Sequence, residues 1–269
     1  MAIALLSPIG DPPEISTSNL FYDIMVVVRC SSVELDAVRG AHPTIMNLPE
    51  NRLFYSHPRG EIWNGEAIAI LSSLPPASVD LIFADPPYNL KKADWDNFQS
   101  QQQYVDWNLQ WIEQAARVLK PTGTLYICGF SEIIADLKLP AMQFFHGCRW
   151  LIWHYKNKAN LRKDWGRSHE SILHLRKSKQ FTFNLDDIRI PYNHHTLKYP
   201  DRSQAKTSQY SNKGKNNYSW QPHPQGAKPK DIIEIPTTCN GMHEKTPHPT
   251  QKPEELLRKI ILASSNPGI

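Results

Sequence analysis

Apolar residues along this 269-residue chain fall into short runs separated by polar and proline-rich stretches. Val79–Ala84 (VDLIFA) is an almost uninterrupted run, which is typical of a strand buried on both faces of a parallel sheet. Thr124–Cys128 is a second such run, and between the two Tyr104–Leu119 spaces its apolar residues at helical intervals. This alternation predicts an α/β fold, a parallel sheet with helical crossovers.

The chain divides into four stretches on this pattern, of which the first two differ sharply. Residues 1–56 are rich in Pro and Ser and show no clear period, although Ile24–Val28 is typical of a buried strand. We assign no function to them. Residues 57–150 carry the alternating pattern, including a helix predicted over Ala67–Leu74 that stops at two prolines.

The other two stretches are less regular. Residues 151–236 begin with strand-like runs at Leu151–Tyr155 and Ser171–Leu175 and then lose periodicity. Residues 237–269 close with a helix predicted over Glu254–Ser264, preceded by a proline that suits the first helical turn.

The charge is unevenly distributed. From Leu151 to Lys230 the chain carries sixteen Lys and Arg against five Asp and Glu, a balance of +11 in a chain of +4 overall, so the remainder carries −7. A basic lobe on an acidic body suits binding to a phosphate backbone, because each phosphate contact releases counterions. A solvated, partly disordered loop would show the same balance, so charge alone leaves both interpretations open.

Cysteine usage and the first residues bear on location. The four cysteines are scattered, with no C-x-x-C and no histidine at ligand spacing, so we predict neither a metal site nor a disulfide framework. Met1–Gly10 is too short in apolar residues for a signal peptide or a membrane span. We therefore expect a soluble, cytoplasmic protein that does not bind membranes. We expect the adjacent His194 and His195 to be exposed to solvent.

The most informative stretch is Asp85-Pro86-Pro87-Tyr88, at the carboxyl end of the predicted strand, where α/β sheets place their ligands. Two prolines stiffen the turn and leave the preceding carbonyls without local amide partners. A carboxylate acceptor beside a flat ring suits an exocyclic amino group on an aromatic base. Acceptors on both hydrogens of such an amine favour a nitrogen lone pair that points at an electrophile. The alternative interpretation is a proline-rich strand exit with a surface tyrosine.

The flanking sequence resembles a known family. VDLIFADPPYNL, followed by WDNFQSQQQYVDWNLQWIEQAARVLKPTGTLYI, is similar to DPPY-type DNA amino-methyltransferases of the β arrangement. IWNGEAIAILSSLPPASVD, WGRSHESILHLRKSKQFTFN and HPTQKPEELLRKIILASSNPG match further motifs in the expected order, so the resemblance covers residues 61–268. It implies a permuted, doubly wound methyltransferase sheet that uses S-adenosylmethionine and contains an inserted target-recognition lobe.

The resemblance also implies a role for each of the three later stretches. Residues 57–150 would be the catalytic half of the core, residues 151–236 the basic target-recognition region, and residues 237–269 the start of the cofactor-binding half.

In the catalytic half, the resemblance implies that Asp85 and the Pro86 backbone hold the target amino group. Tyr88 would stack on a base flipped out of the duplex. Asp85 would also border the cofactor. The residues implied at the methionine end of S-adenosylmethionine are Thr250, Gln251 and Lys252, with Lys252 as partner of the cofactor carboxylate. Glu66, where an Asp is more usual, would approach the adenosine part.

The implied partner is double-stranded DNA. The residues expected to contact phosphates or base edges are Lys156, Lys158, Arg162, Lys163 and Arg167, and the residues expected to stack on bases are Tyr218 and Trp220. An Asp at the first motif position is the family's usual mark of adenine N6 methylation, with cytosine N4 methylation as the alternative. A cognate restriction endonuclease, acting on the same site without direct contact, is a further implied partner.

One departure from the family pattern concerns the cofactor. No G-x-G occurs in the sequence, whereas the family's Gly-rich cofactor loop would be expected directly after Asn266-Pro267-Gly268. The two family strands beyond that loop lie between the Trp63 strand and the Phe83 strand, so we expect a gap at the centre of the sheet. We hypothesise that the chain is incomplete and, alone, neither binds the cofactor tightly nor methylates DNA. An inactive DNA-binding remnant is then the second candidate function.

Overall fold

The computed structural model describes residues 2–6, 23–29, 52–57, 60–90, 97–156, 163–200, 202–203, 219–245 and 250–266. The chain forms two compact units, one of Met1–Phe183 with Asp231–Ile269 and one of Asn184–Lys230. The larger unit contains the nine-stranded sheet and the whole Asp85–Tyr88 segment.

The strands of the larger unit are β1 (Ala2–Leu6), β2 (Asp23–Arg29), β3 (Arg52–His57), β4 (Gly60–Glu66), β5 (Val79–Ala84), β6 (Leu119–Gly129), β7 (Gly147–His154), β8 (His169–Arg176) and β11 (Ile232–Glu234). Its described helices are α3 (Ala67–Ser73), α4 (Gln101–Val118), α5 (Ser131–Ala141) and α7 (Glu254–Ser264). Among the described residues, nine strands form one sheet in the order β11-β7-β8-β6-β5-β1-β2-β4-β3.

The sheet is mixed, with a parallel centre and antiparallel pairs on both sides of it. β5 pairs in parallel with both β1 and β6. β8 runs antiparallel to β6 and β7, and β2 runs antiparallel to β1 and β4. The parallel centre comes from the helical crossover α4 between β5 and β6, whereas antiparallel pairs need no such crossover.

Several predicted elements are confirmed. β5 spans the predicted Val79–Ala84, and all six of its residues are buried. α7 has the predicted bounds. α4 begins three residues before the predicted Tyr104, because the Ser100 hydroxyl accepts a hydrogen bond from the Gln103 amide and caps the helix. β6 begins at Leu119, earlier than the predicted Thr124.

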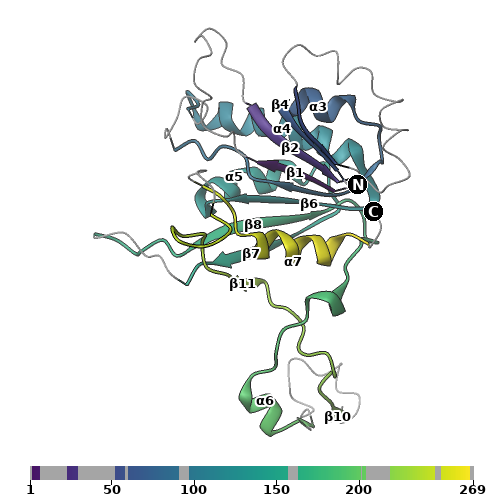
Figure 1. Ribbon diagram of the computed structural model, residues 1–269, viewed down its shortest axis with the longest axis vertical. Coiled ribbons are helices and arrows are strands. Elements are labelled where there is room, and N and C mark those ends of the chain that lie inside the picture. The colour runs from purple at the N-terminus through teal and green to yellow at the C-terminus, as the bar shows by residue number, and fades with distance from the viewer. Residues whose placement is uncertain are drawn as a thin grey trace. The chain divides into compact units, whose positions relative to one another are not determined.

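Helices cover both faces of the sheet, as in a doubly wound α/β fold (Figure 1). Ile82 and Ala84 of β5 face the core beneath α3, α4 and α5, whereas Leu81 and Phe83 face the core beneath α7. Successive strand residues point to opposite faces, so burial on both sides explains the continuous apolar run. Each large apolar side chain buried this way contributes about 1.5–3 kcal/mol of hydrophobic free energy.

The expected gap between the Trp63 strand and the Phe83 strand is not present, and that expectation is wrong. β1 and β2 lie between β5 and β4, so the sheet is continuous there. β1 pairs with β5 from Ala2 opposite Leu81 to Leu5 opposite Ala84, and β2 pairs with β4. The strand predicted at Ile24–Val28 is confirmed as part of β2. These pairings satisfy backbone groups that an interrupted sheet would leave exposed at two edges.

The smaller unit consists of short elements, η2 (Leu185–Ile188), α6 (His194–Lys198), β9 (Arg202–Ser203) and β10 (Ser219–Trp220). Ile190 and Ala227 form an isolated antiparallel bridge, and the Arg189 guanidinium donates to the Gly226 carbonyl at 2.8 Å. Both histidines of α6 are exposed, as expected. Within the described parts of the chain, no helix combines the length and the apolar character that crossing a membrane requires.

Candidate active site

Four segments meet at one edge of the sheet. Asp85 follows the last residue of β5, and β6 ends at Gly129 beside it. Because β8 is antiparallel to β6, its second residue, Glu170, lies at this same edge. Lys252 lies two residues before α7, and its side chain contacts Asp85, which is 167 residues away in sequence. The fold therefore gathers ionisable side chains from distant parts of the chain.

These side chains form a buried hydrogen-bonded cluster, which we call the Asp85 cluster: Asp85, Tyr88, Cys128, Glu170 and Lys252. The Lys252 Nζ donates to Asp85 Oδ2 at 2.7 Å and lies 3.7 Å from Glu170 Oε2. The Tyr88 hydroxyl lies 2.8 Å from both Asp85 Oδ1 and Glu170 Oε2. The Cys128 thiol donates to Glu170 Oε2 at 3.1 Å. Since Tyr88 has a single hydroxyl proton, it can serve one of the two carboxylates at a time.

The Asp85 cluster has an excess of negative charge when both carboxylates are ionised, because Lys252 is its one cation. Burial raises the pKa of the Asp85 carboxyl; the Lys252 ammonium opposes this and the Glu170 carboxylate adds to it. Burial alone would lower the pKa of Lys252, but the charges of Asp85 and Glu170 outweigh it and raise that pKa. Burial also raises the pKa values of Tyr88 and Cys128. The lysine is therefore charged, and the phenol and thiol are neutral donors.

Three of these groups could also bind a metal. The ligand atoms of Asp85, Cys128 and Glu170 lie within 4.8 Å of one another. Burial raises the pKa of the Cys128 thiol, which keeps it protonated and makes it a poor metal ligand, and the Lys252 ammonium already contacts Asp85 Oδ2.

The two prolines differ in how their carbonyls are used. The Tyr104 hydroxyl, on α4, donates to the Pro87 carbonyl at 2.9 Å inside the core. Within the part of the chain that the structure describes, no donor contacts the Pro86 carbonyl. Asn89, with a left-handed backbone (φ 54°), then turns the chain away, and its side chain accepts from the Phe98 amide at 3.1 Å. The turn thus offers one acceptor beside Asp85.

The aromatic ring of Tyr88 forms one wall of the site. It contacts the Phe130 ring edge-on at a centroid distance of 5.0 Å, and the Lys252 Nζ lies 5.4 Å from the centroid of the Tyr88 ring. The Arg167 guanidinium lies 3.7 Å above the Phe130 ring and pairs with the Glu132 carboxylate at 2.6 Å. A row from Tyr88 through Phe130 to Arg167 therefore leads from the buried cluster to the surface.

The residues expected to bind the cofactor are placed differently from one another. Lys252 joins the Asp85 cluster, whereas the Gln251 amide donates to the Glu244 carbonyl at 2.7 Å and Thr250 is exposed. Glu66 caps α3, accepting from the Ile68 amide at 3.1 Å and the Ala69 amide at 2.7 Å.

Glu66 also lies on a different strand from Asp85. Three strand spacings separate β4 from β5, roughly 14 Å, so the structure does not bring Glu66 to the cluster.

The residues expected to bind DNA are only partly described. Lys163 is exposed, and Lys156 is exposed with its Nζ 3.4 Å from Glu234. Arg167 packs over Phe130 as above. Lys158, Arg162 and Tyr218 lie outside the described residues. Trp220 lies in β10.

Sequence reasoning missed Glu170 and Cys128. The available signal for Glu170 was a carboxylate directly before the buried run Ser171–Leu175, and the signal for Cys128 was its place at the end of the Thr124–Cys128 strand. Neither signal identifies the partner, because Glu170 is 82 residues from Tyr88 and 42 residues from Cys128 in sequence.

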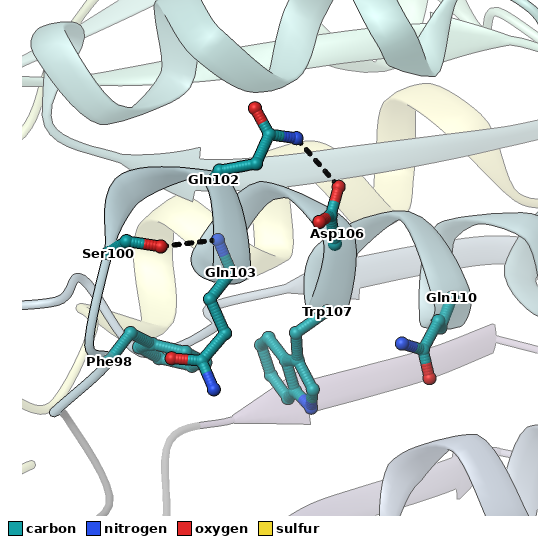
Figure 2. Close-up of a pocket in the computed structure, with 7 residues that line it drawn as sticks. All are labelled: Phe98, Ser100, Gln102, Gln103, Asp106, Trp107 and Gln110. Atoms are coloured by element: carbon teal, nitrogen blue, oxygen red, sulfur yellow. Dashed lines mark hydrogen bonds between the residues drawn. The ribbon is translucent and has the colours of Figure 1, made fainter.

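A pocket of about 430 Å³ lies along the first half of α4 (Figure 2). Its lining residues are Phe98, Ser100, Gln102, Gln103, Asp106, Trp107 and Gln110. None of the residues expected at the site lines it. Phe98 also packs edge-on against Tyr104, whose hydroxyl holds the Pro87 carbonyl, so the pocket adjoins the support of the Asp85–Tyr88 turn rather than the cluster itself.

Comparison with known proteins finds DNA methyltransferases both as the matching family model and as sequence relatives. The family model described as "DNA methylase" (N6_N4_Mtase) matches residues 79–268. The chain is 36% identical over 216 residues to DNA adenine methyltransferase YhdJ of Escherichia coli (strain K12), covering 77% of this chain and 68% of the relative. It is 34% identical over 209 residues to the Type II methyltransferase M.HpaI of Haemophilus parainfluenzae, covering 75% of this chain and 59% of that relative.

Among solved structures, the PvuII DNA methyltransferase (cytosine-N4-specific) is similar with a TM-score of 0.52 and 15% identity. The match covers 76% of this chain and 69% of that one. At this identity the likeness shows a shared fold.

Proposed function

Because the chain belongs to the N6/N4 family of DNA methylases, we propose that it methylates adenine N6 at a specific sequence in double-stranded DNA. We further propose that it is the modification enzyme of a restriction system and that a cognate endonuclease recognises the same site. The observation that carries the proposal is the pair of acceptors at the end of β5: a buried Asp85 carboxylate, and a Pro86 carbonyl that no donor among the described residues contacts.

These acceptors suit an amino group. An exocyclic amine has two N–H bonds, of which Asp85 would accept one and the Pro86 carbonyl the other. An amine conjugated with a purine ring is a weak nucleophile, and two fixed acceptors favour the geometry in which its lone pair leaves the ring plane. No covalent enzyme intermediate is needed, so the protein contributes positioning and electrostatics.

Binding of a base requires a rearrangement of Tyr88. Its hydroxyl donates to Asp85 Oδ1 and its ring packs on Phe130, so the hydroxyl competes with a target amino group for that oxygen. Glu170 offers the alternative acceptor at the same 2.8 Å distance. If the Tyr88 hydroxyl donates its hydrogen bond to Glu170 instead of Asp85, Asp85 Oδ1 becomes available to the amino group, and the Tyr88 ring remains as a stacking surface.

The Asp85 cluster also fits the family's methyl donor. S-adenosylmethionine supplies an electrophilic methyl group on a positively charged sulfonium, and the excess negative charge of two carboxylates against one ammonium suits a cation. Lys252 would hold the cofactor carboxylate, which requires its Nζ to exchange the 2.7 Å contact with Asp85 for the new one. Thr250 and Gln251, next to Lys252, are assigned to the same end of the cofactor. Glu66 is assigned to the adenosine side.

The proposed DNA contacts are those given by the sequence. Lys156, Lys163 and Arg167 supply exposed or half-exposed positive charge within the larger unit. Lys158, Arg162, Tyr218 and Trp220 complete the proposed set from the basic region. Each Lys or Arg that contacts a phosphate should reduce the salt dependence of binding when it is removed.

The test is product analysis in a methylation-deficient host. The gene is expressed with the DNA that follows it in its genome, and separately with the coding region stopped at Ile269. Nucleosides from host DNA are quantified by mass spectrometry, and modified positions are mapped by long-read sequencing. N6-methyladenine at one sequence is the expected product. N4-methylcytosine would replace the proposal with the cytosine alternative, and neither product from either gene would refute it.

A matched pair of variants identifies the site. Asp85→Asn should abolish the product, because an amide presents an N–H where the acceptor is required. Asp80→Asn is the control, since Asp80 is a buried carboxylate of β5, the strand that leads to Asp85, and it pairs with Lys120 at 2.9 Å. Equal loss of product in both variants would mean that general damage to β5, rather than acceptor chemistry, explains the result.

A further inference from the structure

Trp165 is unusually exposed. Its relative exposure is 93%, the highest among the large apolar residues that the structure describes as exposed. Tryptophan is on average highly buried, because its ring carries the largest apolar area of any side chain. A single exposed apolar residue needs no explanation by itself, so the surroundings of Trp165 decide whether it has a role.

The chain around Trp165 runs along the rim of the candidate active site. β7 ends at His154 and β8 begins at His169 directly opposite, both at the edge that contains the Asp85 cluster. Trp165 precedes by two residues Arg167, which lies 3.7 Å above the Phe130 ring. Two residues span at most about 7 Å, so the Trp165 Cα lies within that distance of the Cα of Arg167, whose side chain ends the row from Tyr88.

The stretch that contains Trp165 is basic, because residues 151–230 carry sixteen Lys and Arg against five Asp and Glu. Lys163 is exposed two residues before Trp165, and Arg167, two residues after it, pairs with Glu132. Asp164 uses one carboxylate oxygen to accept from the Trp165 amide at 2.7 Å, which fixes the backbone at the base of the indole. A flat ring flanked by cations is the combination with which proteins stack on nucleic-acid bases while neighbouring charges hold the phosphates.

We propose that Trp165 stacks on the DNA at the place that the target nucleotide leaves when it rotates into the Asp85 site. This inference rests on the proposed function. Rotation of a nucleotide out of a duplex removes the stacking of its neighbours. An indole that enters or covers the gap restores part of that stacking, and it stabilises the extruded state without contacting the reacting atoms. Trp165 is therefore a positioning residue.

Two duplexes of about 20 base pairs test the proposal, one intact and one with an abasic site in place of an internal adenine. Each duplex is longer than the roughly 4–16 nucleotides that single-strand-binding domains engage through stacking. Binding of the full chain is measured by fluorescence anisotropy of labelled DNA. We expect tighter binding to the abasic duplex, with on the order of tenfold contributed by one base-stacking contact.

Three variants separate stacking from other effects. Trp165→Ala should lose the stacking part of the preference, about tenfold, and keep only what the missing base saves in unpairing, while Trp165→Phe, which keeps a ring, should retain more of it. Leu139→Ala is the matched control, because Leu139 is 81% exposed on α5 and should leave the preference unchanged. The difference in tryptophan emission between the wild type and Trp165→Phe reports on Trp165 itself and should be quenched by the abasic duplex.

The outcomes distinguish this inference from the proposed function. Methylation of DNA by a protein whose gap preference is undiminished in Trp165→Ala would overturn the inference alone. Gap preference that depends on Trp165, in a protein that yields no methylated base, would refute the proposed function and leave the DNA contact standing. Quenching of Trp165 that rises with protein concentration in the absence of DNA would assign the residue to contacts between protein copies and overturn the inference.

Discussion

Replacing Lys252 by Met should expose how much the Asp85 cluster depends on its one cation. The Nζ lies 2.7 Å from Asp85 Oδ2 and 3.7 Å from Glu170 Oε2, and the Lys252 and Asp85 side chains are 5% and 4% exposed. Removing one partner of a buried ion pair leaves an uncompensated charge and costs about 3–5 kcal/mol. For a unit of this size each kcal/mol lowers the melting temperature by about 2–4 °C, so the expected decrease is roughly 6–20 °C.

The pH dependence gives the sharper test. A carboxyl whose folded pKa lies above its unfolded value contributes stability at low pH and loses it as the pH rises through the folded pKa. The pKa of Asp85 is already raised from 3.8 by burial, and loss of Lys252 removes the effect that opposes this. The destabilisation of Lys252→Met should therefore grow as the pH rises above the ordinary carboxyl range.

Urea unfolding at several pH values, followed by far-UV circular dichroism, measures this difference. Lys120→Met is the control, because the Lys120 side chain is 37% exposed in its pair with Asp80 and a pair open to solvent contributes about 1 kcal/mol or less. Adding Glu170→Gln to Lys252→Met should restore part of the lost stability. Equal losses for the two lysine variants, independent of pH, would refute the reasoning.

Three further changes test other parts of the structure. Glu66→Ala removes the cap of α3 and should cost about 1 kcal/mol in urea unfolding, with Glu66→Gln in between; an unchanged midpoint would contradict the capping role. Tyr104→Phe leaves the buried Pro87 carbonyl unpaired and should cost about 1–3 kcal/mol, against no loss if water replaces the hydroxyl. Burial and the nearby charges of Arg176 and Arg149 lower the pKa of His174 to about 3, so stability should fall as the pH drops below 6.5. His174→Phe should weaken that fall, and an identical acid profile would argue against it.

The sequence predicted those elements whose boundaries are local. Val79–Ala84 is apolar throughout and ends at a proline pair, and Glu254–Ser264 begins after Pro253, so β5 and α7 have the predicted bounds. The motif places Lys252 near the cofactor carboxylate, but it gives no sign of the contact between its ammonium and Asp85, 167 residues away. Glu170 escaped notice for the same reason, because its partners are distant in sequence. Residues 1–56 had no clear period, yet two of their runs fill the predicted gap in the sheet.

The central position of β1 also bears on the order in which the molecule forms during synthesis. Ala2 of β1 pairs with Leu81 of β5, a separation that a ribosome translating about 5–20 residues per second covers in roughly 4–16 s. During that interval β1 can pair with β2 once β2 has been synthesised, and the opposite edge of β1, which pairs with β5 in the folded protein, stays unpaired. The nascent chain therefore passes through a stage in which an apolar strand edge is available to other chains. Slower translation between residues 29 and 79 would lengthen that stage and increase aggregation.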